Sequence, residues 1–538
     1  MPYPLTLTTM LDRNRMLFGK KEVVTRDFHG IHRYTYADYH VRVAKLANSL
    51  ARLGVKRGER VATFGWNSHR HLEAYFAVPC MGAILHTLNI RLFADQFAYI
   101  VNHAEDAVML VDEDLVPAVE AVSGNFPTVR AYVVMGDRKE IPETKLRPVF
   151  SYEALLEAER GEFDWRRDIA EDSTAALCYT TATTGNPKGV PYSHRGIYLH
   201  ALAISAKDAL GIGEGEAVLP VVPMFHVNAW GLPFAATWMG AKQVFPGSRP
   251  DPKALLELIS GERVTIAAGV PTVWMGVLQL LEGGGHDVSS LKAIVCGGSA
   301  APRALIEKIE GKYGVPFVHA YGMTETYPVV LVSRPKSYME GLPPDELYAY
   351  KGKQGTLLPG LEMRVVAEDG TEVPRDGRSL GELRLRGPWI TEEYYREPER
   401  TREMIRDGWL CTGDVVTVDP EGYVQIQDRT RDLIKSGGEW ISSIDLENTI
   451  MAHPAVEEAA VIGVPSEKWT ERPMACVVLK PGFRGKVEVG EILAFLSTRV
   501  AKWWIPDEVV FVDAIPKTSV GKFAKRFLRE QFKEKKFA

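Results

Sequence analysis

The sequence predicts an α/β protein with two parts: a large N-terminal domain of parallel-rich sheets and helices, and a small, mobile α+β C-terminal domain. The chain has 538 residues, which is more than one hydrophobic core normally organises. Strand-like and helix-like segments alternate through most of the chain, which is typical of parallel sheets covered by helices. Near residue 430 the sequence changes character, which indicates a boundary between two folding units.

The alternation is clearest in the middle of the chain. Buried strands are expected over 264–267, 291–295 and 317–320. A helix is expected over 302–313, with a proline in its first turn and Gly314 after its last turn. In sheets of this kind ligands bind at the carboxyl ends of the strands. The loops that follow these strands are therefore candidates for a binding site.

A short, densely charged segment over 428–432 separates the two predicted domains. We place the N-terminal domain at 1–430, the C-terminal domain at 431–538 and a hinge near 428–435, with an ordinary surface loop as the simpler alternative to a hinge. The residues that follow predict a small α+β fold after a glycine-rich loop. Its expected elements are helices over 443–453 and 489–500 and strands over 459–464, 474–479 and 509–512.

Composition and charge exclude several classes of protein. Hydrophobic residues make up 46% of the chain, and the formal net charge is −5, so no basic surface for nucleic acid is expected. The five cysteines are far apart and lack metal-binding spacing. The longest apolar stretch, 74–85, contains Pro79 and is too short to span a bilayer. We expect a cytoplasmic protein without a signal peptide, and leave open peripheral contact with a membrane and a homodimer.

The strongest candidate for a binding site is the segment 179–189, which follows an apolar strand over 175–178. Threonines, glycines and a lysine after a strand predict a phosphate-binding loop, because backbone N–H groups and hydroxyls donate to phosphate oxygens and the lysine adds charge. The spacing is not that of a Walker A loop, and a polar surface turn is the alternative on composition alone. The candidate nucleotide-binding residues are Thr180, Thr181, Thr183, Thr184, Gly185 and Lys188.

This segment, Y-T-T-A-T-T-G-N-P-K-G, resembles the Y-T-S-G-T-T-G-x-P-K-G signature of the adenylate-forming superfamily. That superfamily includes acyl-CoA and aryl-CoA synthetases, the adenylation domains of peptide synthetases and firefly luciferases. The sequence departs from the signature at Thr181, which keeps the hydroxyl of serine, and at Ala182, which has less backbone freedom than glycine. The resemblance implies the adenylate-forming fold and the binding of ATP, and it extends over nearly the whole chain.

Residues 321–325, Y-G-M-T-E, resemble a second motif of the superfamily. The resemblance implies that Tyr321 stacks on adenine and that Thr324 contacts the α-phosphate. It also implies that Glu325 binds Mg²⁺, and we choose Thr184 as its partner, since oxygen ligands suit a hard cation. Taken alone, Glu325 is more simply interpreted as a solvated loop residue. The other candidates from this motif are Met323 in the nucleotide site and Gly322 in both the nucleotide and the substrate site.

Two further segments resemble the remainder of the nucleotide site. Gly298, Ser299 and Ala300 resemble the adenine-side loop, where a glycine lets the backbone approach a flat base; a strand-to-helix turn is compatible with the same residues. Asp414, in a T-G-D motif, is implied to bind both ribose hydroxyls, because a carboxylate accepts two hydroxyl donors. Arg429 is implied to contact ribose as well.

The charged segment and the end of the chain resemble the two motifs that carry the lysines of the superfamily. The resemblance places the hinge at Arg431, where the family usually has aspartate or lysine, and makes Lys435 face the adenylate during thioester formation. It makes Lys522, in a P-x-x-x-x-G-K motif, the lysine that forms the adenylate, since it neutralises a carboxylate and an α-phosphate as they approach. Out of context, Lys522 is an ordinary surface lysine.

The acyl group is assigned from the segment 223–231, which resembles the family's aromatic-histidine segment. His226 is expected to border the reacting carboxylate and Trp230 to lie at the mouth of an acyl tunnel, although both are equally well explained as core residues. No charged residue occurs over 218–241, where an amino-acid substrate would need a counter-charge. The segment 66–92 is most similar to medium- and long-chain fatty acyl-CoA synthetases, so we favour a fatty acid.

The implied reaction has two halves. A fatty acid attacks the α-phosphate of ATP with Mg²⁺ as cofactor, which forms acyl-AMP and pyrophosphate, and coenzyme A then displaces AMP. Both steps depend on positioning and charge neutralisation. The alternatives are an aryl-CoA ligase, an adenylation enzyme that loads a carrier protein, and a non-catalytic nucleotide sensor; the last is disfavoured by the presence of Lys522 and Glu325.

Overall fold

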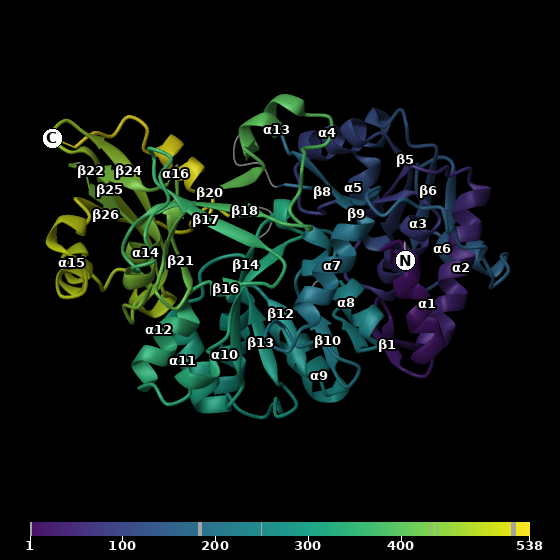
Figure 1. The fold of residues 1–538 in the computed structure, drawn as a ribbon, viewed down its shortest axis with the longest axis horizontal. Coiled ribbons are helices and arrows are strands. Elements are labelled where there is room, and N and C mark those ends of the chain that lie inside the picture. Colours follow the sequence, from purple (N-terminus) through teal and green to yellow (C-terminus); the bar gives the residue numbers. More distant parts are fainter. Residues whose placement is uncertain are drawn as a thin grey trace.

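The computed structural model describes residues 3–180, 186–248, 250–430, 432–437, 439–517 and 523–537. The described strands form four sheets. Figure 1 shows the elements of the last hundred residues gathered at one end of the molecule, beyond the sheets of the first 430 residues. The predicted class, parallel-rich sheets with helices followed by a small α+β unit, is confirmed.

A seven-stranded sheet has the strand order β7-β6-β5-β3-β4-β8-β9 and is parallel except for the last pair. Strands β5 and β6 are buried along their whole length, as expected for a parallel sheet covered on both faces. The strands are β3 (Arg60–Phe64), β4 (Ile84–Thr87), β5 (Asp106–Asp112), β6 (Ala131–Met135), β7 (Val149–Ser151), β8 (Thr174–Tyr179) and β9 (Gly189–Ser193).

A nine-stranded sheet has the order β16-β15-β14-β13-β12-β10-β11-β1-β2. Its central strands from β14 to β1 are parallel, and antiparallel strands close both edges. The strands are β1 (Glu22–Asp27), β2 (Gly30–Thr35), β10 (Ala217–Pro220), β11 (Lys242–Phe245), β12 (Ile266–Gly269), β13 (Ala293–Cys296), β14 (Phe317–Gly322), β15 (Val329–Ser333) and β16 (Thr356–Leu357).

Two further sheets follow in the chain. The third is antiparallel and contains β17 (Glu362–Val366), β18 (Gly381–Arg386), β19 (Ile405–Arg406), β20 (Trp409–Val418) and β21 (Val424–Arg429). The fourth contains β22 (Ile434–Ser436), β23 (Glu439–Ile441), β24 (Val456–Ser466), β25 (Thr470–Leu479) and β26 (Glu508–Phe511). Among the strand pairs that the structure describes in this sheet, β25–β26 is the parallel one and the others are antiparallel.

Helices cover the first two sheets and flank the fourth. Several begin at hydrogen-bonding caps; at the start of α2, Thr35 and Asp38 form a reciprocal capping box. The helices of the first 430 residues are α1 (Leu7–Leu17), α2 (Tyr36–Arg52), α3 (His69–Cys80), α4 (Ala94–Ala104), α5 (Val116–Glu120), α6 (Tyr152–Glu157), α7 (His194–Ser205), α8 (Leu232–Met239), α9 (Pro252–Glu262), α10 (Pro271–Glu282), α11 (Arg303–Tyr313), α12 (Pro344–Gly352) and α13 (Pro398–Met404). Those after residue 430 are α14 (Ser443–Met451), α15 (Val489–Ser497) and α16 (Lys525–Gln531).

Most predicted elements are present with shifted ends. The strands expected over 264–267 and 291–295 are β12 and β13, each displaced by two residues at its start, and the helix over 302–313 is α11. The five elements expected after residue 440 are all found, as α14, α15, β24, β25 and β26. The glycine-rich loop predicted before them instead contains a short hairpin, β22–β23.

The buried apolar residues divide at the same place as the sheets. Three hydrophobic clusters take their buried members from residues 7–424, and two take theirs from residues 434–528. No cluster of buried apolar side chains within the described ranges crosses that boundary. In the part of the chain that the structure describes, no helix has the length and apolar character needed to cross a membrane.

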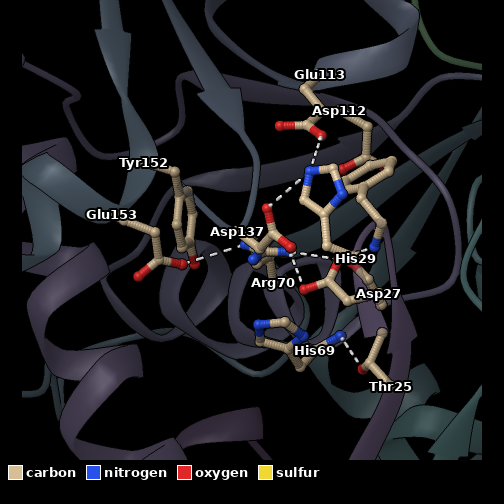
Figure 2. A network of polar contacts seen from close by, with 12 residues as sticks. Thr25, Asp27, His29, His69, Arg70, Asp112, Glu113, Asp137, Tyr152 and Glu153 are labelled. Carbon is tan, nitrogen blue, oxygen red and sulfur yellow. Dashed lines mark hydrogen bonds and ion pairs between the residues drawn. The ribbon is translucent and has the colours of Figure 1, made fainter. Parts of the chain in front are cut away.

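A buried polar network joins β1, the strand next to the edge of the nine-stranded sheet, to helices α3 and α6 (Figure 2). Arg70 of α3 is only 2% exposed; its Nη1 lies 2.9 Å from Asp27 of β1, and its Nε lies 3.1 Å from Glu153 of α6. The backbone N–H of His69 donates to Thr25 of β1 at 3.0 Å. Because charged groups are costly to bury unless paired, this network fixes how the two sheets pack.

Replacing Arg70 with methionine should lower the free energy of unfolding by about 3–5 kcal/mol, because Asp27 is then a buried carboxylate without its partner. Arg33→Met is the matched control: Arg33 lies on the neighbouring β2 but forms its ion pairs, with Glu22 and Glu262, at the surface, so a loss of less than about 1 kcal/mol is expected. Urea denaturation measures both. Equal losses in the two variants would contradict this role for the network.

Candidate active site

The predicted phosphate loop leaves the carboxyl end of β8 and returns to β9. Two hydrogen bonds close its base: the N–H of Thr180 donates to the carbonyl of Lys188 at 2.9 Å, and the N–H of Lys188 donates to Oγ1 of Thr180 at 3.2 Å. The predicted residues Thr181, Thr183, Thr184 and Gly185, together with Ala182, lie outside the described residues. Only the two ends of the loop are therefore placed, and they are hydrogen-bonded to each other at the edge of the sheet.

Lys188 and Glu325 are connected through Tyr394. The Lys188 ammonium lies 4.6 Å from the centre of the Tyr394 ring, and the hydroxyl of Tyr394 donates to Oε1 of Glu325 at 2.6 Å. Glu325 is 6% exposed. Burial, followed by the charge of Glu325, raises the pKa of Tyr394, so this hydroxyl stays a donor. Sequence analysis missed Tyr394, which lies in an E-E-Y-Y-R segment without any recognised motif.

The Y-G-M-T-E motif lies where β14 ends and turns into a short 3-10 helix (Thr324–Thr326). The carbonyl of Thr324 accepts a hydrogen bond from the hydroxyl of Tyr192 on β9 at 2.6 Å, which joins the motif to the strand after the phosphate loop. Gly322 packs so tightly that a Cβ there would lie 1.7 Å from the carbonyl oxygen of Pro328. Only glycine fits this close backbone approach.

Two predicted nucleotide-binding residues, Tyr321 and Arg429, converge on the carboxylate of a third, Asp414. Asp414 of β20 accepts a hydrogen bond from the Tyr321 hydroxyl at 2.5 Å, and its other oxygen lies 2.6 Å from Nε of Arg429. Asp414 and Arg429 are paired directly across β20 and β21. Burial and the Asp414 charge raise the pKa of Tyr321, and the same carboxylate raises the pKa of Arg429. Tyrosine and arginine therefore keep their protons, and Asp414 is held as an acceptor.

The predicted adenine-side loop lies between β13 and α11. Gly298 has a φ of +83°, a left-handed conformation that favours glycine. The carbonyl of Ser299 lies 3.4 Å from Nε2 of the buried His319 on β14. A Cβ at Gly297 would lie 2.6 Å from the carbonyl of Ala320 and 3.1 Å from the Trp230 ring. This close packing brings the loop, which also contains Ala300, against the predicted acyl segment.

The acyl segment contains an unusual backbone feature. Residues Val227, Asn228, Ala229 and Trp230 have φ values of 43°, 50°, 48° and 58°, and Gly231 follows at 76°. Such left-handed residues cost roughly 1–2 kcal/mol each when they are not glycine. Strain of this kind persists where the surrounding structure enforces it, often at functional sites.

Asn228 anchors the left-handed segment to the phosphate-loop sheet. Its side chain is 1% exposed, and its Oδ1 lies 3.3 Å from Cys178 Sγ and 3.4 Å from Thr87 Oγ1. Cys178 is two residues before Thr180, so the acyl segment and the phosphate loop share a support. Sequence analysis did not single out Asn228. Trp230 is 9% exposed, and His226, the residue before the left-handed turn, is partly buried.

The predicted lysines are placed only in part. Lys435 of β22 is exposed, and its ammonium lies 4.9 Å from the centre of the Trp440 ring. The backbone N–H of Lys435 donates to the carboxylate of Glu471 at 3.0 Å. Among the described contacts, none joins Lys435 to the Asp414 cluster. Lys522 and Arg431 lie outside the described residues.

The fold is that of an α/β protein, and the contacts of Asp414 with Tyr321 and Arg429 make its surroundings a candidate nucleotide site. The chain belongs to the AMP-binding enzyme family: the model of that family matches residues 11–395, and the model of its C-terminal domain matches residues 445–522.

Several curated proteins resemble the chain over nearly its full length. A long-chain-fatty-acid–CoA ligase of Thermus thermophilus is 51% identical over 98% of this chain and 96% of its own. A 3-methylmercaptopropionyl-CoA ligase of Ruegeria lacuscaerulensis is 40% identical, covering 99% and 98%. A medium-chain-fatty-acid–CoA ligase of Ectopseudomonas oleovorans is 40% identical, covering 98% and 96%.

Solved structures show the same fold. The crystal structure of an anthranilate CoA ligase in complex with anthranoyl-AMP has a TM-score of 0.89 to this chain at 28% sequence identity, covering 99% of this chain and 98% of that one. The similarity therefore extends through both the N-terminal sheets and the small C-terminal unit.

Replacing Asp414 with asparagine should weaken ATP binding about 10- to 100-fold, because hydrogen bonds to a charged group are lost and Arg429 is left without its counter-charge. Asp419→Asn is the control: Asp419 follows β20 in the chain and pairs with Lys353 instead. Titration calorimetry gives the ATP dissociation constant of each variant. Unchanged ATP affinity in Asp414→Asn would show that this carboxylate does not hold the nucleotide.

Proposed function

We propose that the protein ligates a medium- to long-chain fatty acid to coenzyme A in two steps, through an acyl-AMP intermediate, with release of pyrophosphate and AMP. The observation that carries this proposal is the 51% identity to a long-chain-fatty-acid–CoA ligase over 98% of the chain. The arrangement of Asp414 between Tyr321 and Arg429 supports the proposal, because a carboxylate can accept hydrogen bonds from both ribose hydroxyls of a nucleotide.

ATP is held from three sides in this proposal. The phosphate loop, through Thr180, Thr181, Thr183, Thr184, Gly185 and Lys188, binds the phosphates. Tyr321 and the Gly298–Ala300 loop flank adenine, while Asp414 and Arg429 bind ribose. The Tyr394 hydroxyl, which cannot ionise readily, orients Glu325.

A magnesium ion fits the residues around Glu325. The carboxylate is buried, and its described hydrogen bond to Oε1 comes from a neutral tyrosine hydroxyl, so a cation beside it would be favourable. Glu325 and Thr184 would hold the ion, which would neutralise phosphate charge. Thr324 lies beside this carboxylate and is assigned to the α-phosphate.

The two lysines divide the chemistry. Lys522 neutralises the charges that meet when the fatty-acid carboxylate attacks the α-phosphate. Lys435 faces the adenylate during thioester formation, after the C-terminal domain, residues 431–538, turns at Arg431. Domain rotations of this kind are common in enzymes with successive steps.

The fatty acid is assigned to the acyl segment. His226 borders the carboxylate, Gly322 lines the substrate site, and Trp230 limits the tunnel. The Trp230 ring packs on Gly297 beside the adenine-side loop, which suits a side chain placed between nucleotide and acyl chain. The identity to a 3-methylmercaptopropionyl-CoA ligase and the likeness to an anthranilate CoA ligase make short thioether acids and aryl acids the competing substrates.

A panel of acids tests the proposed substrate. Each added methylene that is buried contributes about 0.8 kcal/mol, so kcat/KM for coenzyme A-dependent AMP formation should rise by orders of magnitude from butyrate to palmitate. Highest activity with 3-methylmercaptopropionate or anthranilate would overturn the fatty-acid assignment. AMP release that does not depend on coenzyme A would favour loading of a carrier protein.

Trp230→Ala should change the ratio of kcat/KM between long and short acids, because it alters the tunnel that the two acids fill to different depths. Loss of stability alone lowers the active fraction equally for both acids and leaves the ratio unchanged. Trp503→Ala, which removes an exposed tryptophan of the C-terminal unit, is the control. An unchanged ratio in Trp230→Ala would assign this ring to core packing.

Glu325→Gln keeps the size of the side chain but removes its charge. The Mg²⁺ concentration for half-maximal acyl-AMP formation should rise about tenfold or more, since a charged ligand is replaced by a neutral one. Glu393→Gln, an exposed position one residue before Tyr394, is the control. If the Mg²⁺ dependence of Glu325→Gln matches that of the control, Glu325 is not a metal ligand.

A further inference from the structure

A buried polar cluster joins the two parts of the chain. Asp428, at the end of β21, accepts hydrogen bonds at Oδ2 from the N–H and the hydroxyl of Ser443, at 2.7 and 2.5 Å. The ammonium of Lys525 donates to the same hydroxyl at 2.5 Å and lies 2.6 Å from Oε1 of Glu447. Asp428 belongs to the third sheet, whereas Ser443, Glu447 and Lys525 belong to α14 and α16 of the C-terminal unit.

The charges of this cluster depend on one another. Asp428 is 1% exposed, and the side chains of Glu447 and Lys525 are 9% and 10% exposed. Burial raises the pKa of both carboxyls, while Lys525 opposes that shift; the carboxylates in turn raise the pKa of Lys525 despite its burial. The ammonium of Lys525 thus compensates the charges of two buried carboxylates, Asp428 and Glu447. Asp432 and Asp445 are further acidic neighbours of the cluster.

The cluster lies next in sequence to two parts of the proposed active site, the ribose-binding residues and the adenylation lysine. Asp428 immediately precedes Arg429, whose guanidinium pairs with Asp414. Lys525 begins α16, three residues after Lys522 in the sequence. The contacts therefore run from the proposed ribose carboxylate through Arg429, Asp428 and Ser443 to the start of the helix that follows the proposed adenylation lysine.

We propose that Asp428 and Lys525 are positioning residues for the first half-reaction: the bonds of Asp428 to Ser443, and of Ser443 to Lys525, hold the C-terminal unit in the arrangement in which acyl-AMP forms. The proposal rests on the proposed function. The contact spans the predicted hinge, so turning at Arg431 moves Ser443 relative to Asp428. Lys435, which the proposed function assigns to the second half-reaction, has its described contacts with Trp440 and Glu471 and none with Asp414, which agrees with the arrangement of the first half-reaction.

The test separates the two half-reactions in single turnovers. Asp428→Asn should slow formation of acyl-AMP from palmitate and ATP by about tenfold or more, because charge-assisted hydrogen bonds are weakened. Conversion of supplied palmitoyl-AMP and coenzyme A to thioester should stay within about twofold of the unaltered protein or become faster, since the competing arrangement gains population. Lys525→Met should behave in the same way.

The matched control is Lys535→Met. Lys535 also forms an ion pair within the C-terminal unit, with Glu508, and its loss should leave the ratio of the two half-reactions unchanged. Ser443→Ala removes one hydroxyl from the cluster without leaving a buried charge unpaired. It should shift the ratio in the same direction, and it keeps the proposal testable if either charge variant fails to show cooperative thermal unfolding.

Three results would overturn the proposal: an equal loss in both half-reactions, a loss confined to thioester formation, or no change of the ratio in any cluster variant. These outcomes are distinct from failure of the proposed function, which would appear in the unaltered protein as no palmitate-dependent exchange of pyrophosphate into ATP.

Discussion

The hydrogen-bonded carboxylate of Asp414 is the contact on which the arrangement of the site depends. It lies on β20, yet its two partners come from different sheets: Tyr321 from the end of the nine-stranded sheet and Arg429 from β21. A buried carboxylate needs such donors because leaving it unpaired costs several kcal/mol. Because the carboxylate of Asp414 needs both partners, it fixes the third sheet against the nine-stranded sheet. The series of contacts that leads into the C-terminal unit also begins at this carboxylate.

The second constraint is the strained turn at residues 227–231. A left-handed path through valine, asparagine, alanine and tryptophan is unfavourable on its own, and Asn228 supports it from beneath through Cys178 and Thr87. The turn directs Trp230 onto Gly297. The same strand, β8, thus supports the phosphate loop at its end and the acyl segment along its side, so the two parts of the site are positioned by one structural element.

The sequence was sufficient for the fold class, because the fold class depends on local patterns. Alternating strand and helix periodicity located β12, β13 and α11. The resemblance of three short motifs singled out Tyr321, Asp414 and Arg429, which the structure brings into contact. Asn228, Tyr192 and Tyr394 were missed, since each acts through a partner distant in sequence. The left-handed turn was also missed, because only Asn228 and Gly231 among its residues favour a positive φ, whereas Val227, Ala229 and Trp230 do not. The short β22–β23 hairpin could not be distinguished from a loop in a glycine-rich segment.

The joint between the two parts of the chain is polar, and the apolar clusters stop on either side of it. Surfaces of this kind can separate in water at modest cost, because every exposed group finds a water partner. An apolar joint would expose an apolar surface each time it opened, and exposed apolar surfaces promote aggregation. The consequence is durability: in the domain rotation proposed above, this joint opens and closes without exposing an apolar surface to which other copies of the protein could adhere.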